Sequence, residues 1–222
     1  MHSSLEQLTL IKNKVYDIVT KKQLKTVPKI IVVTKTFSLS KFLPLLKAGH
    51  IHYGENKMQE AEEKWTETKI VHKDLQLHMI GKLQTNKVKK AVKLFDYIHS
   101  LDNKKLAQKI FQSEQELNKK VKLFIQVNIA GENQKSGILL KDLNDFYYYC
   151  VNDLSLNIIG LMSLPPINSN SDYYFKLLKE KADKLNLMDL SMGMSSDFEK
   201  AILSGSTYLR LGTLILGKRG IT

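Results

Sequence analysis

The sequence predicts an α/β fold, a (β/α)8 TIM barrel with an extra N-terminal helix. Eight strand-like segments alternate with helix-like segments after one leading helix, and such alternation implies a parallel sheet with right-handed crossovers. The length of 222 residues suits this barrel, and two segments rich in glycine and hydroxyl residues fall at units seven and eight, as its phosphate sites do. No Gly-x-Gly-x-x-Gly follows the first strand, so an open dinucleotide-binding sheet lacks its signature. We expect one domain over residues 1–222, with a leading helical segment at 1–27 and the barrel at 28–222.

Apolar patterns place the elements along the chain. Residues 5–24 carry apolar side chains at helical spacing, which indicates the leading helix. The first strand, residues 30–33, is an unbroken β-branched run after Pro28, which is typical of a strand buried on both faces. The further strands are expected at residues 51–53, 75–80, 97–100, 121–129, 156–161, 187–190 and 208–209. The helices that follow the strands are expected at residues 41–48, 58–68, 86–94, 104–117, 139–151, 173–185, 198–203 and 214–217.

The composition bounds the class of protein. An apolar fraction of 43% is enough for a substantial core, and 25% charged residues argue against extensive disorder. No stretch approaches the roughly 20 apolar residues of a membrane span, and the N-terminus lacks the features of a signal peptide. Cys150 is the only cysteine, so no internal disulfide can form and a reducing, cytoplasmic compartment is expected. A lone domain without an obvious apolar patch suggests a monomer.

The formal net charge of +12 raises nucleic acid as a partner. However, Arg210 and Arg219 are the only arginines among 34 basic residues, and arginine is the residue that forks onto phosphate and guanine edges. The lysines are spread over nearly every expected helix, as on a solvated surface. We therefore expect no nucleic acid and no membrane as partners. A nucleic-acid module is the alternative, and its test is whether any binding disappears at moderate salt.

Lys35 stands at the C-terminal end of the first buried strand. A buried lysine amine is unfavourable unless it reaches a partner or a cavity. Amines in such places can form Schiff bases, because partial desolvation lowers the pKa of the ammonium and frees the nucleophilic lone pair. The alternative is a lysine that extends to solvent where the strand emerges.

Two segments near the C-terminus combine glycine with hydroxyl residues. Residues 190–197 read Leu-Ser-Met-Gly-Met-Ser-Ser-Asp, and residues 208–213 read Tyr-Leu-Arg-Leu-Gly-Thr. Their amides and hydroxyls can surround a phosphate. In a barrel, residues at the carboxyl ends of the strands converge on one face; here they are Lys35, Asn56, His78, Gly81, Asn128, Met162, Ser195, Arg210 and Thr213. A Schiff-base lysine, a phosphate cradle and side chains that orient a ring together describe a site for pyridoxal 5′-phosphate (PLP).

Eight blocks, in order from about residue 28 to residue 217, resemble the PLP homeostasis proteins, single-domain barrels related to the N-terminal domain of alanine racemase. The matching stretches are Val33-Thr34-Lys35-Thr36, Tyr53-Gly54-Glu55-Asn56, His78-Met79-Ile80-Gly81-Lys82-Leu83-Gln84-Thr85-Asn86-Lys87, Gln126-Val127-Asn128-Ile129, Lys135-Ser136-Gly137, Gly160-Leu161-Met162, Met192-Gly193-Met194-Ser195-Ser196-Asp197 and Arg210-Leu211-Gly212-Thr213.

The resemblance implies a set of cofactor-binding residues, with no catalytic residue and no metal. The set is Lys35 as the internal-aldimine lysine, Ser195, Gly212 and Thr213 at the phosphate, Arg210 near the ring nitrogen, and Asn56 and Met162 beside the ring. The resemblance also implies storage, protection and delivery of PLP, through transient contact with apo-PLP enzymes. Many members have a second lysine two residues after the Schiff-base lysine, where this chain has Phe37. A role for that lysine in passing on the cofactor is therefore in doubt here.

A PLP-dependent amino-acid racemase on the same barrel is the main alternative. PLP catalysis needs an electron sink and a second acid/base group, and an arginine at the ring nitrogen weakens the sink by disfavouring protonation. In alanine racemases the second base is a tyrosine of a separate C-terminal domain, and this chain stops soon after its eighth unit. We therefore expect no enzymatic turnover.

A metal site is a weaker alternative. His50 and His52 alternate onto one strand face, with His78 near them in the fold. A His-x-His pair without a carboxylate or cysteine at suitable spacing is common by chance.

Overall fold

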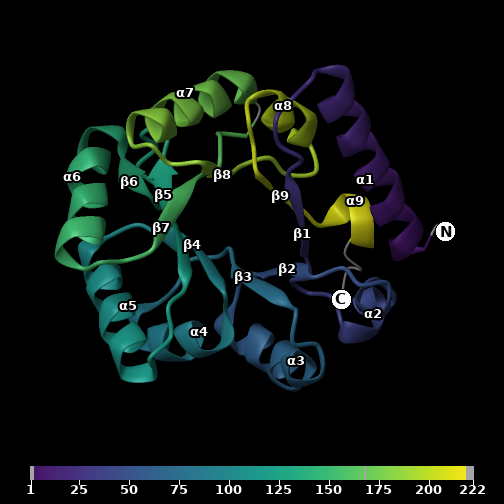
Figure 1. Ribbon diagram of the computed structural model, residues 1–222, viewed down its shortest axis with the longest axis horizontal. Helices are drawn as coiled ribbons and strands as arrows, with labels where there is room; N and C mark the ends of the chain where they lie inside the picture. Colours follow the sequence, from purple (N-terminus) through teal and green to yellow (C-terminus); the bar gives the residue numbers. More distant parts are fainter. Residues whose placement is uncertain (1–2, 168, 219–222) are drawn as a thin grey trace.

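The computed structural model describes residues 3–167 and 169–218, and in it parallel strands close into a barrel ringed by helices (Figure 1). The described residues form a nine-stranded sheet in which β6 pairs only with β5, and the other eight strands form the closed barrel. The circle is completed where β9 pairs with β1. The strands are β1 (Lys29–Val33), β2 (His52–Glu55), β3 (Gln76–Met79), β4 (Tyr97–Leu101), β5 (Lys122–Asn128), β6 (Ile138–Leu139), β7 (Ile158–Ser163), β8 (Asp189–Ser191) and β9 (Tyr208–Leu211). The TIM barrel expected from the sequence is confirmed.

Helices cover the outside of the barrel, and α1 packs against α2, α8 and α9. The helices are α1 (Ser4–Lys21), α2 (Leu39–Lys47), α3 (Met58–Val71), α4 (Val88–Leu94), α5 (Lys104–Leu117), α6 (Leu143–Tyr148), α7 (Ser171–Lys184), α8 (Phe198–Leu203) and α9 (Thr213–Leu216). None of the helices in the described ranges is both long enough and apolar enough to span a bilayer.

The leading helix α1 starts at a capping box and ends earlier than expected. The Ser3 hydroxyl accepts a hydrogen bond from the Glu6 amide, and the Ser3 amide donates to the Glu6 carboxylate. The helix ends at Lys21, not at residue 24, because Gln23 adopts the left-handed region with φ of 50°. The terminal apolar residue of the expected stripe, Leu24, therefore lies outside the helix.

The helix expected at residues 139–151 has a different structure at both ends. It starts with the two-residue strand β6 and the 3-10 turn η2 (Leu140–Asp142), and α6 continues into the π-helical turn η3 (Tyr149–Asp153). Gly137, just before β6, has φ of 129°, and a Cβ there would lie 2.5 Å from the Asn128 amide nitrogen. Glycine thus lets the chain return close enough to pair β6 with β5.

The barrel interior is polar for this fold. Side chains alternate in and out along each strand, so the inward positions follow a period of two. Barrel interiors are usually filled with Val, Ile and Leu. Here Ile31, Tyr97, Phe124, Met162 and Tyr208 form an interior apolar cluster, and buried histidines pack against its rings. The interior therefore holds polar groups that need hydrogen-bond partners.

Candidate functional site

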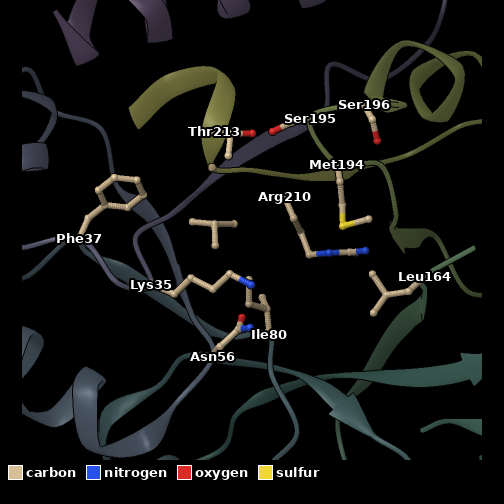
Figure 2. Close-up of a pocket in the computed structure, with 12 residues that line it drawn as sticks. Lys35, Phe37, Asn56, Ile80, Leu164, Met194, Ser195, Ser196, Arg210 and Thr213 are labelled. Atoms are coloured by element: carbon tan, nitrogen blue, oxygen red, sulfur yellow. The ribbon is translucent and has the colours of Figure 1, made fainter. Parts of the chain in front are cut away.

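A cavity of about 380 Å³ opens at the carboxyl ends of the strands (Figure 2). Its volume lies within the range of small-molecule sites. The cavity is lined by Val33, Lys35, Phe37, Asn56, Ile80, Leu164, Met194, Ser195, Ser196, Arg210, Gly212 and Thr213. Six of the seven cofactor-binding residues expected from the sequence are in this lining: Lys35, Asn56, Ser195, Arg210, Gly212 and Thr213.

Met162 is the seventh, and it is not among the lining residues. Its side chain is 1% exposed and packs in the interior cluster, one layer below the cavity. Leu164, two residues further along the same strand direction, lines the cavity instead. Gly81 and Asn128 line a neighbouring cavity of about 350 Å³ that shares Asn56 with the first.

Lys35 directly follows β1, and the backbone around it is held from several sides. The Thr34 amide donates to the Gly54 carbonyl of β2 at 3.0 Å, and the Lys64 amine donates to the Thr34 carbonyl at 2.8 Å. The Thr36 amide donates to the Glu60 carboxylate, and Thr36 has φ of 66°, which is uncommon for a non-glycine residue. These contacts fix the direction in which Lys35 leaves the strand; in Figure 2 its amine points into the cavity.

A buried carboxylate supports this arrangement from below. Glu55 is fully buried and accepts hydrogen bonds from the Thr34 hydroxyl at 2.7 Å and the Trp65 indole at 3.1 Å. The Lys64 amine lies 3.2 Å from the same oxygen. Burial raises the pKa of the Glu55 carboxyl, while its hydrogen bonds and Lys64 oppose that shift. Glu55 and Lys64 therefore belong to the support of Lys35 and are not in the cavity lining.

The hydroxyl-rich segments meet on the opposite side of the cavity from Asn56. Figure 2 shows the hydroxyls of Ser195 and Thr213 pointing toward one another, with Ser196 beyond them. Gly193 has φ of 90°, and a Cβ there would lie 2.6 Å from the Ala201 side chain, so the turn before Ser195 requires glycine. The two segments predicted to surround a phosphate thus lie side by side.

Arg210 is the cationic group deepest in the cavity. It is 5% exposed, and its guanidinium donates to the Ser191 hydroxyl at 2.7 Å and to the Ser163 carbonyl at 3.0 Å. Burial lowers the pKa of Arg210 to about 10, which leaves it cationic at neutral pH. Within the described residues no carboxylate forms an ion pair with Arg210, and none lines the cavity. The cavity therefore favours an anion.

Sequence reasoning missed the apolar walls of the cavity. Ile80, Leu164 and Met194 were assigned no role, yet they line it. The period of two along a strand would have found two of them, since Ile80 is two residues after His78 and Leu164 two after Met162. The same count places Met162 one layer below the cavity lining, which is where the structure has it.

The histidines considered for a metal site are only partly together. His52 Nδ1 lies 3.0 Å from His78 Nε2, while the His50 ring contacts the His52 carbonyl oxygen. In the part of the chain that the structure describes, no group of three or more His, Cys, Asp or Glu side chains is placed to hold a metal ion.

Comparison with known proteins places this barrel among its relatives. Residues 14–220 match the family described as alanine racemase, N-terminal domain. The chain is 40% identical over 176 residues to the pyridoxal phosphate homeostasis protein of Aquifex aeolicus, covering 75% of this chain and 76% of that protein. Another protein of this name, from Synechocystis, is 34% identical over 86% of this chain and 91% of its own length.

Solved structures also resemble this barrel. PipY of Synechococcus elongatus PCC7942 superposes with a TM-score of 0.80 without PLP and 0.77 with PLP bound, at 31% and 32% identity. In both cases the match covers 91% of this chain and 100% of PipY. The alanine racemase of Corynebacterium glutamicum matches at 13% identity with a TM-score of 0.67, over 94% of this chain and 61% of the racemase. At that identity the likeness is one of fold.

Proposed function

This chain belongs to the family of pyridoxal phosphate homeostasis proteins, and from that premise we propose that it binds PLP and stores, protects and delivers it. The observation that carries the proposal is the convergence of a lysine amine, a buried arginine and two hydroxyl-bearing segments on one cavity. The relatives are named as homeostasis proteins and not as enzymes. Accordingly, we assign the chain a carrier role.

The residues present fit the cofactor. Among the described residues, the lining contains no carboxylate and two cationic side chains, which suits a phosphate dianion. Phe37, Ile80, Leu164 and Met194 offer apolar surface to a pyridine ring. In the proposal, Lys35 holds the cofactor's aldehyde carbon as a Schiff base, Ser195, Thr213 and the Gly212 amide bind the phosphate, and Arg210 and Asn56 orient the ring. Met162 supports the ring from the layer beneath it.

A carrier needs a covalent bond that protects the aldehyde and that another amine can reverse. Lys35 is half-buried, so an incoming amine can approach the bond from the open mouth of the cavity. Transfer then requires no acid/base pair aimed at a substrate α-carbon. The racemase alternative requires one, and none of the described lining residues is a tyrosine, histidine or carboxylate.

The single cysteine supports a further part of the proposal. Burial raises the pKa of the Cys150 thiol to about 12, so the one cysteine is an unreactive core residue, as suits a cytoplasmic protein. The proposal also includes action as a single-domain monomer that contacts apo-PLP enzymes transiently.

Borohydride reduction of PLP-loaded protein tests the covalent site. Peptide mapping should find the pyridoxyl group on Lys35, and Lys35→Ala should lose the yellow colour of the loaded protein. Labelling chiefly at another lysine, with Lys35 unmodified, rejects the assignment. Lys82 serves as the control position, since its side chain lines only the neighbouring cavities.

A transfer assay separates the carrier from the racemase. The loaded protein should restore activity to an apo-PLP enzyme and leave the α-proton of L-alanine unexchanged in deuterated water. Rapid α-proton exchange that depends on Lys35 would instead favour the racemase over the carrier.

A further inference from the structure

A continuous chain of polar side chains runs through the barrel interior and ends at Arg210. His52 Nδ1 lies 3.0 Å from His78 Nε2, and His78 Nδ1 lies 2.9 Å from His99 Nε2. His99 Nδ1 then lies 2.8 Å from the Ser191 hydroxyl, which accepts a hydrogen bond from Arg210. The chain takes one residue from each of β2, β3, β4, β8 and β9. It begins at the half-buried His52 and is fully enclosed from His78 onward.

The direction of every proton in this chain follows from its arginine end. A guanidinium can only donate, so the Ser191 oxygen accepts from Arg210. In the described part of the chain, the single Ser191 proton has one remaining acceptor in reach, His99 Nδ1. His99 must then carry its proton on Nε2 and donate to His78, and His78 must donate from Nε2 to His52 in the same way. The opposite order would leave the buried Ser191 proton without a partner, which is unfavourable.

The groups around the chain keep its histidines neutral. Burial lowers the pKa of His78 and of His99 well below the ordinary value, and neighbouring His99 and Arg210 respectively add to these shifts. His52 faces the amines of Lys29 and Lys122 and the more distant Asp96 carboxylate. Burial and these two lysines lower the pKa of His52 to about 4. The Tyr97 and Tyr208 rings also lie beside His52, with ring centroids 6.5 and 6.4 Å from its own. The Tyr97 hydroxyl accepts a hydrogen bond from Lys122, and the Tyr208 hydroxyl accepts one from Lys29.

The neutral hydrogen-bonded chain gives the buried guanidinium of Arg210 a partner that carries no charge. The guanidinium is buried, and no ion pair with it occurs among the described residues. The lone pairs of the hydroxyl and imidazoles all point toward it, and aligned hydrogen bonds polarise one another. A carboxylate partner would neutralise the positive charge of Arg210. The uncharged hydrogen-bonded chain instead fixes the position of the guanidinium, whose charge can then interact with an anionic ligand.

We propose that Ser191 and His99, supported by His78 and His52, are positioning residues that aim Arg210 at the ring of the bound cofactor. The inference rests on the proposed function for its ligand. It assigns a role to three interior histidines that neither line the cavity nor form a metal site. It also explains why a barrel interior contains imidazoles where aliphatic side chains are usual.

The proton order is tested without any cofactor. In protein labelled with [15N]histidine, long-range proton–nitrogen correlation at pH 7 should show His52, His78 and His99 neutral and protonated on Nε2. Lowering the pH to 5.5 should leave all three signals unchanged. An Nδ1-protonated tautomer or an imidazolium at His78 or His99 overturns the proposal, and this measurement needs no variant.

The positioning role is tested with His99→Phe. The His99 ring stacks on Phe124 with centroids 4.3 Å apart, so phenylalanine keeps the packing and removes the acceptor of the Ser191 proton. Because the chain has only two arginines, [15N]arginine labelling isolates the Arg210 side-chain signal, which should shift or broaden. A neutral hydrogen bond corresponds to about a two- to tenfold loss of PLP affinity, with an equal loss for pyridoxal and a shifted absorption maximum.

Two further variants complete the test. His99→Asn retains an acceptor near the Nδ1 position and should recover most of the affinity. His50→Gln alters a buried histidine outside the chain and should change neither the arginine signal nor the spectrum. An unchanged Arg210 signal and wild-type affinity in His99→Phe reject the positioning role. Failure of the wild-type protein to bind PLP would reject the proposed function and leave the tautomer result standing.

Discussion

At the scale of single residues, Lys64 lies outside the cavity but contacts the backbone next to Lys35. Its amine binds the Thr34 carbonyl and neutralises the buried Glu55, so Lys64→Met leaves a buried charge without its partner. We expect a loss of about 3 kcal/mol in the free energy of unfolding, measured by urea denaturation, and slower Schiff-base formation at Lys35.

Lys14→Met is the matched control for Lys64→Met. The Lys14–Glu199 ion pair is half-exposed on both sides, so its removal should alter stability by less than about 1 kcal/mol and leave Schiff-base formation unchanged. Equal effects of the two substitutions would contradict the role of Lys64.

Thr213→Val probes the phosphate side of the cavity. Valine nearly keeps the shape of threonine and removes the hydroxyl, and a hydrogen bond to a charged group is worth about 1.5–3 kcal/mol. PLP affinity, followed by absorbance titration, should fall about ten- to a hundredfold. Pyridoxal has no phosphate and should bind as before; equal losses for both ligands would show that Thr213 acts elsewhere.

At the scale of elements, Gly137 is the residue on which β6 depends. Gly137→Ala forces a Cβ against the Asn128 amide in addition to a positive φ, so we expect destabilisation well above 1 kcal/mol in thermal or urea unfolding. Gly131→Ala is the control, because Gly131 also has a positive φ of 68° but nothing within 4 Å of its Cβ. If the two variants unfold alike, crowding against β5 is not the reason for glycine at 137.

The same elements show what the sequence can and cannot predict. All eight barrel strands were predicted within a few residues, because strand-like and helix-like segments alternate along the whole sequence. The strand β6 was missed because two residues carry no periodicity. Its pairing depends on the close approach of Gly137, just before it, to Asn128 of β5, and the sequence pattern does not reveal that contact. The layer of Met162 was missed because the period of two was not followed to the end of its strand, where Leu164, two residues later, lines the cavity.

At the scale of the whole molecule, the buried histidines make stability depend on pH. Four histidines have a pKa lowered by burial: His50, His52, His78 and His99. Their folded pKa values lie below the unfolded value of about 6.5, so the unfolded chain binds more protons and stability falls as the pH drops below that value. Each histidine adds a slope of about 1.4 kcal/mol per pH unit, down to about pH 4 for His50 and His52.

Urea unfolding at a series of pH values measures this slope. Glu55 and Asp102 have raised pKa values, so each lowers the free energy of unfolding as the pH rises above its unfolded pKa. Replacement of His99 by phenylalanine should remove one histidine's share of the slope. A midpoint that is flat between pH 7 and pH 5 would mean that these imidazoles are protonated in the folded protein.

The pairing of β1 with β9, which closes the barrel, has a consequence for when the newly made chain can bind its ligand. Lys35 follows the first strand, whereas Arg210 and Thr213 come from the last, and the two strands are joined by the β1–β9 pairing. In the proposed site, residues from both strands hold the cofactor, so we expect a chain still emerging from the ribosome not to bind it. A ligand bound across this pairing adds RT ln(1 + [L]/Kd) to the free energy of unfolding of the chain. We therefore expect ligand binding to report completed folding, and ligand release to lower the stability of the carrier by the same amount.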